Sequence, residues 1–160
     1  MNAPRIIELG LAAVLLKHGE LGAGTSVRPW RSLASTKTDQ SRVLPCVDIR
    51  CTAAQHDEDQ ATQSCLCDIT IQTSGPEDAD HAQITAIEDS VRDTLERLYD
   101  QTKAGAGDEY ATFIASVAEE SDGLFILGGF RFNGGSAPMD DDDSNLLTIS
   151  ITADFAKSGG

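Results

Sequence analysis

Basic residues are scarce in this 160-residue chain, which has 12 lysines and arginines against 26 aspartates and glutamates. The resulting net charge of −14 argues against a protein whose main task is to grip nucleic acid, because phosphate neutralisation needs clustered cationic side chains. No stretch approaches the roughly 20 apolar residues that a membrane span requires. We therefore expect a soluble, intracellular protein with no membrane partner.

The common catalytic motifs are also missing. The sequence has no Gly-x-x-x-x-Gly-Lys phosphate loop, no Gly-x-Ser-x-Gly elbow and no His-Glu-x-x-His pair. The three histidines, His18, His56 and His81, have no cysteine or serine beside them in a nucleophile motif. We predict that the protein is not an enzyme and that it uses no cofactor.

A strand followed by a long helix organises the chain. Residues 64–73 alternate between apolar and polar side chains, which is typical of a half-buried strand. From residue 80 to 103 the apolar residues recur every three or four positions, which predicts an amphipathic helix about 36 Å long. Asp80, followed by Gln83, is the expected N-cap with its return partner.

Further elements surround this pair. An apolar first helix is expected over 4–17; Glu8 interrupts its apolar run, which favours a helix of the fold over a signal peptide. Because it is apolar on more than one side, we expect its own fold or a neighbouring subunit to bury it on most sides. The remaining expected elements are strands over 43–54, 124–132 and 146–155 and a short helix over 110–120. Gly128 and Gly129 suggest a bulge or a close backbone approach.

These elements predict one domain, residues 1–160, of the α+β class. Its order is one helix, two strands, a long and a short helix, and two strands. The expected architecture is a four-stranded antiparallel sheet with helices packed on one face.

The segment 21–42 is a possible interaction arm. It lacks a sustained period, is relatively basic and is long for a connection inside a compact domain, so it is either a functional arm or partly strand. One interpretation is an ordered loop pinned by Trp30. The other is an arm that docks on a neighbouring chain. The candidate interface residues are Arg28, Trp30, Arg31 and Arg42.

Two clusters raise the question of metal binding. Cys51, Cys65 and Cys67 share the side of their strands with apolar residues, so we interpret them as small buried residues with free thiols; a zinc site is the alternative. The run Asp140, Asp141, Asp142 and Asp143 lacks the ligand spacing of a calcium loop and is interpreted as a solvated acidic loop. No metal site is predicted.

The order of these patterns resembles the tail terminator, or head–tail joining, proteins of long-tailed bacteriophages. The resemblance covers most of the chain. Its parts are the apolar first helix (5–17), the paired segments 44–50 and 67–72, the acidic link 75–80 into the long helix, the segment 123–129, and a loop before 146–152. These are patterns of residue type and order rather than one diagnostic motif.

The resemblance implies a structural virion protein that forms a ring, expected to be a homohexamer, on the last ring of the tail tube. Such a ring ends tube polymerisation and offers a surface to the head connector, a stopper or adaptor protein. DNA passes through it without specific binding. The location implied is the tail and neck of the virion, with assembly in the host cytoplasm. Asp140 to Asp143 are the candidates for the lumen or rim, where acidic residues would repel the DNA.

Alternatives remain open at this point. The acidic residues could serve solubility alone. The chain could be another phage ring protein, such as a tail-tube subunit or a head–tail adaptor, or more distantly a monomeric module that binds a metal or another ligand.

Overall fold

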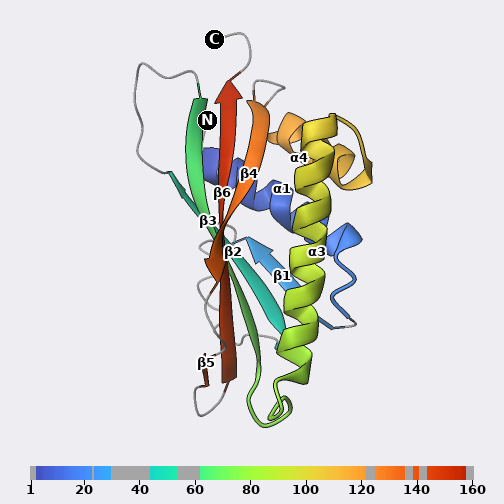
Figure 1. Cartoon of the computed structure of the whole chain (residues 1–160), viewed down its shortest axis with the longest axis vertical. Coiled ribbons are helices and arrows are strands. Elements are labelled where there is room, and N and C mark those ends of the chain that lie inside the picture. The colour runs from blue at the N-terminus through green and yellow to red at the C-terminus, as the bar shows by residue number, and fades with distance from the viewer. Residues whose placement is uncertain are drawn as a thin grey trace.

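The computed structural model describes residues 3–22, 24–29, 44–53, 62–121, 125–135, 139–140 and 144–157. Within these residues, three helices lie on one face of a twisted sheet (Figure 1). The elements are α1 (Ala3–His18), β1 (Ser26–Pro29), β2 (Cys46–Ala53), β3 (Thr62–Ser74), α3 (Ala82–Ala104), α4 (Asp108–Ser121), β4 (Phe125–Gly135), β5 (Met139–Asp140) and β6 (Ser144–Lys157).

The sheet has the strand order β1-β2-β3-β6-β4, and the short β5 pairs with β6. The expected α+β class is confirmed, and the four long strands β2, β3, β6 and β4 run antiparallel to one another in this order, as predicted. The prediction of a purely antiparallel sheet is wrong, because β1 lies parallel to β2 with Val27 opposite Val47. A parallel pair needs a long return connection, and the sequence between β1 and β2 provides one.

The expected alternation along the strands divides the sheet into two faces. The core face packs against the helices and is buried; it includes Val47, Ile49, Cys51, Cys65, Cys67, Ile69, Ile71, Leu147, Ile149, Ile151 and Ala153. The opposite side, here called the open face, carries mainly polar side chains: Arg28, Asp48, Arg50, Thr52, Ser64, Leu66, Asp68, Thr70, Gln72, Thr148, Ser150, Thr152 and Asp154. Cys46, which is fully buried, and Leu146 flank Gln72 on the same side. Hydrogen bonds between strands cross this face, from Ser64 to Asp154 (2.6 Å) and from Ser150 to Asp68 (2.7 Å).

Helix α3 packs on the core face through the predicted stripe, but its N-terminus differs from the prediction. His81, not Asp80, is the N-cap, with φ of 62° and no side-chain capping bond. The carboxylate of Asp78 instead accepts hydrogen bonds from the backbone N–H groups of Gln83 (2.8 Å) and Ile84 (3.1 Å). The tight turn before the helix brings this buried carboxylate under the first helical turn, where the N–H groups lack intrahelical partners.

Helix α1 lies between the sheet and α4, so it is buried on most sides, as expected. Its Glu8 is fully buried. Strand β1 pairs with β2 only as far as Ile49. Two residues further along β2, the backbone N–H of Cys51 points to the same edge of that strand and donates a hydrogen bond to Oε2 of Glu8 (3.0 Å). The carboxylate therefore satisfies a sheet-edge donor just beyond the end of β1.

The glycine-rich strand β4 is irregular, as the sequence suggests. Its pairing with β6 shifts register between Leu127 and Gly129, and again between Phe132 and Gly134. The first shift falls at the double glycine, where a bulge was expected.

Candidate interaction surfaces

The negative charge is concentrated on the two helices α3 and α4 and the turn before them. Residues 77–120 contain twelve acidic and three basic side chains, a net charge of −9, whereas residues 1–76 contain eight and seven, a net charge of −1. The remaining −4 lies within residues 121–160, so residues 77–120 carry most of the net charge of the chain.

The outer side of α3 forms the acidic ridge, defined here as Asp89, Asp93, Glu96 and Asp100. Their spacing of four, three and four residues places them on one line of the helix, directed away from the buried stripe, and spans about 16 Å. All four side chains are exposed, and none forms an ion pair with another described residue. The ridge therefore presents uncompensated negative charge to its surroundings.

Contacts at both ends hold the ridge in place. At the N-terminus of α3, Asp78 also accepts a hydrogen bond from Thr73 (2.7 Å). Towards the C-terminus, Arg97 donates to Glu109 of α4 (3.0 Å), and the Gln101 side chain donates to the same carboxylate. The hydrogen bond from Gln101, and after it the guanidinium of Arg97, lower the pKa of Glu109 against the opposing effect of burial. These contacts tie both ends of α3 to neighbouring parts of the fold.

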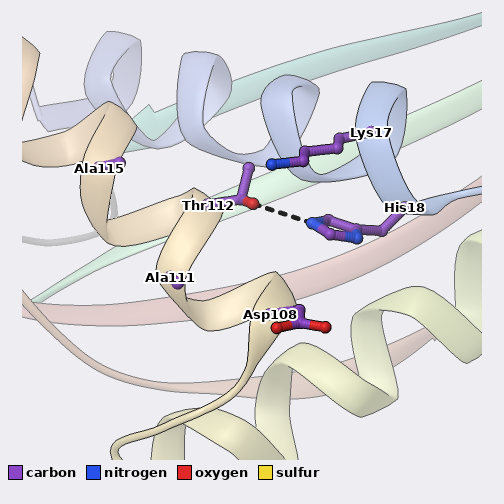
Figure 2. A pocket seen from close by; sticks show the side chains of 6 residues that line it. All are labelled: Lys17, His18, Asp108, Ala111, Thr112 and Ala115. Carbon is purple, nitrogen blue, oxygen red and sulfur yellow. Dashed lines mark hydrogen bonds between the residues drawn. The ribbon is translucent and has the colours of Figure 1, made fainter.

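A pocket of about 380 Å³ lies where the end of α1 meets α4 (Figure 2). It is lined by Lys17, His18, Asp108, Ala111, Thr112 and Ala115. His18 Nε2 lies 2.8 Å from Thr112 Oγ1, which joins the two helices across the pocket. The small side chains of Ala111 and Ala115 leave this space unfilled, and the described polar contact in it joins the two helices.

The candidate interface residues of segment 21–42 are only partly described. Residues 26–29 form β1, so this segment is partly strand, one of the two expected possibilities. Arg28 pairs with Asp48 of β2 through Nε to Oδ1 (2.8 Å) and Nη2 to Oδ2 (3.1 Å), which holds β1 against its neighbour. Trp30, Arg31 and Arg42 lie outside the described residues.

The tetra-aspartate run is described at its first residue alone. Asp140 is in β5, where its backbone pairs with that of Asn145 in β6. Asp141, Asp142 and Asp143 lie outside the described residues, as does His56. The acidic ridge on α3 is the acidic surface whose geometry is defined.

The four cysteines, Cys46, Cys51, Cys65 and Cys67, form no disulfide and are fully buried, which confirms the interpretation of the last three as small core residues. Burial raises the pKa of the Cys51 thiol well above its usual value, and contact with Cys67 adds to the shift. Within the described ranges, no group of three or more histidine, cysteine or acidic side chains is arranged to hold a metal ion.

Sequence reasoning missed three features that position these surfaces. The acidic ridge is visible in the four-three-four spacing of its carboxylates, but the same spacing is found on the polar side of many amphipathic helices. The capping role of Asp78 depends on a turn whose geometry the sequence does not specify. The contact of Glu8 with Cys51 joins residues 43 positions apart, and no local signal indicates it.

Among the residues that the structure describes, no helix is long and apolar enough to cross a membrane. Neither a scan against models of known protein families nor a search of curated proteins found a match to this chain.

Proposed function

We propose that this protein is a structural component of the bacteriophage neck that forms a ring, six-membered in the simplest case, on the end of the tail tube. The ring stops tube polymerisation and joins the tail to the head connector. Its location is the virion, after assembly in the host cytoplasm. Its partners are further copies of itself, the tail-tube protein and the connector, with DNA passing through.

The observation that carries this proposal is the concentration of charge on one exposed helical layer. A ring around a DNA path needs one acidic surface that repels the passing phosphates and other surfaces that permit contact between copies. The net charge of −9 within residues 77–120 and of −1 within residues 1–76 fits that division. We assign the acidic ridge of α3 to the lumen.

The order of elements is compatible with the proposal. The first helix α1, the β2–β3 pair, the long α3 and the final β4–β6 pair follow one another in the order on which the resemblance to tail terminators rests. A fold alone does not identify a function, so this agreement supports the proposal only together with the charge distribution.

The test is addition of the purified protein to growing tail tubes. We expect tubes of shorter, uniform length in negative-stain images, each with a ring at one end. Light scattering across a concentration series measures the mass of the free protein. Tubes that grow to the same length with and without the protein would overturn the proposal. Self-stacking of the protein into tubes would identify a tube subunit instead.

A further inference from the structure

Two thiols face each other across neighbouring strands of the sheet. Strands β2 and β3 lie side by side, and Cys51 of β2 is directly opposite Cys67 of β3 (Figure 1). Both side chains are fully buried on the core face. Cys65 of β3 lies instead between Ala53 of β2 and Ala153 of β6, so no thiol is directly across from it. The register of the sheet therefore selects Cys51 and Cys67 as a pair.

The position of this pair in the ladder brings the two side chains close together. The backbone N–H of Cys51 donates to Glu8 at the edge of β2 that faces away from β3, so Cys51 and Cys67 form a non-hydrogen-bonded pair. The Cα atoms of such a pair are about 4.5 Å apart, within the range of about 4.4–6.8 Å that a disulfide spans. The two thiols are already in hydrogen-bonding contact. The backbone therefore has the spacing that an S–S bond requires.

Neighbouring contacts hold the pair in register. On one side, Glu8 of α1 fixes the backbone of Cys51, and on the other side Cys67 lies opposite Ile151 of β6. A slip of one residue between β2 and β3 would turn one of the two thiols to the open face. Because little freedom remains to be lost when the bond forms, each thiol is present at a high effective concentration for the other.

We propose that Cys51 and Cys67 are a redox modification site, at which a small-molecule disulfide such as oxidised glutathione converts the two thiols to a disulfide between β2 and β3. The thiolate of one cysteine attacks a sulfur of the reagent and releases the first glutathione thiolate. The thiolate of the second cysteine then attacks the cysteine sulfur of this mixed disulfide and releases the second glutathione thiolate. Two electrons pass to the reagent, and the two protons lost by the cysteines are taken up by the released thiolates.

Burial determines when this reaction takes place. It raises the pKa of the Cys51 thiol, and it keeps the reagent out of the packed core, so the folded dithiol exchanges slowly. Oxidation therefore occurs while the strands pair during folding, or when they separate transiently. The site is a property of the chain itself. Its use after release from the reducing host cytoplasm into an oxidising medium rests on the proposed virion function.

The test compares disulfide exchange in the folded and the denatured chain. The full chain is refolded in a mixture of reduced and oxidised glutathione, trapped by alkylation and mapped by peptide mass. We expect a linkage of Cys51 to Cys67 as the main product, with Cys46 and Cys65 alkylated. In denaturant the same mixture should favour neighbours in the sequence, such as Cys46 with Cys51, because four intervening residues close a shorter loop than fifteen. The fold prevents that linkage, since Cys46 lies on the open face and Cys51 on the core face.

Two variants serve as matched controls. Cys65→Ala removes a thiol that is equally buried and should leave the linkage intact, whereas Cys67→Ala should abolish it. Circular dichroism checks that both variants fold. In the unmodified chain the disulfide should raise the midpoint of thermal unfolding by roughly 5–10 °C over that of the reduced chain, because it restricts the unfolded state.

Three outcomes would overturn the proposal. They are a main product that contains Cys46 or Cys65, refolded protein without a linkage in a large excess of oxidised glutathione, and a linked chain that unfolds at a lower temperature than the reduced chain. The linkage measurements on the unmodified chain do not depend on the folding of any variant. A protein that forms the Cys51–Cys67 linkage but does not cap tail tubes would contradict the proposed function and leave this site intact.

Discussion

Asn145 in β6 donates a hydrogen bond from its side-chain amide to the backbone carbonyl of Asp78, 67 residues earlier in the chain, over 2.7 Å. The same amide lies 3.4 Å from the Asp78 carboxylate, which also caps α3. A single buried position thus joins the last strand, the turn after β3 and the helix that carries the acidic ridge. We expect the orientation of that ridge to depend on this position.

Replacing Asp78 by alanine should lower the free energy of unfolding by about 3 kcal/mol, because two helix N–H groups and the buried side chains of Thr73 and Asn145 lose an acceptor. Chemical denaturation at neutral pH measures the change. The matched control is Asp80→Ala. Among the described residues, the exposed carboxylate of Asp80 accepts a hydrogen bond from Ala82 alone (3.2 Å), so this substitution should cost less than about 1 kcal/mol. Equal losses in the two variants would contradict the assigned cap.

Acid should weaken the fold through the same carboxylate. Burial alone would raise the pKa of Asp78. The pKa is nevertheless lowered, because the carboxylate accepts hydrogen bonds from the side chains of Thr73 and Asn145 and from the backbone of Gln83 and Ile84. A carboxyl whose folded-state pKa is depressed contributes stability above its unfolded pKa, about 3.9, and loses it as the pH falls through the folded-state pKa. Unfolding followed from about pH 6 to pH 2 should therefore show a decline below about pH 4 that is smaller in Asp78→Asn. An unchanged decline in that variant would assign the acid sensitivity to other carboxylates.

Gly10 of α1 should not tolerate a side chain. A Cβ at this position would lie 2.8 Å from Cε2 of Phe113 in α4, which is closer than real Cβ contacts. Gly10→Ala is therefore expected to lower stability by about 1–3 kcal/mol, although helix propensity alone predicts a gain of about 1 kcal/mol. Thermal or chemical unfolding measures the sign. Adding Phe113→Leu should recover part of the loss in a double-mutant cycle, and strictly additive effects would exclude the steric cause.

The cysteines should be unreactive in the folded protein. All four are fully buried, and burial raises the pKa of Cys51, so little thiolate is present to attack a reagent. A thiol-specific alkylating reagent followed by mass measurement should add no label under native conditions and four labels after unfolding. Rapid native labelling of Cys51 or Cys67 would show that the sheet opens there.

Local periodicity predicted most of the fold, because alternation in the strands and the three-to-four spacing in α3 are set by which side chains meet the core. The parallel pairing of β1 was missed because four residues, Ser26–Pro29, carry too little pattern to fix a partner or a direction. The Asp78 cap was missed for a different reason. Asp78 and Asp80 are equivalent in sequence, and only the turn geometry, with His81 at φ of 62°, decides which carboxylate reaches the helix.

Candidate surfaces were harder to predict than elements. Leu16 looked like one more apolar residue of α1, and only the packing of that helix against the sheet and α4 shows that this side chain remains exposed. The run Asp140 to Asp143 is easily recognised in the sequence because its four carboxylates are consecutive. The acidic ridge has the same number of carboxylates, but they are adjacent in space instead.

The acidic ridge provides a final prediction in which stability and function change in opposite directions. Replacing Asp89, Asp93, Glu96 and Asp100 by their amides relieves like-charge contacts three and four residues apart, each worth about 0.2–0.5 kcal/mol, so the isolated protein should become slightly more stable, most visibly at low salt. If the ridge lines the lumen, the same variant should slow DNA passage, because phosphates no longer meet a repulsive wall. DNA ejection and infectivity of phage assembled with the variant measure this effect. Replacing Asp140 to Asp143 by asparagine is the matched comparison, with the same loss of charge at the other candidate for the lumen. A defect in the Asp140 to Asp143 variant alone would indicate that this loop, and not the acidic ridge, lines the lumen. Normal infectivity of both variants would contradict a repulsive role for either surface.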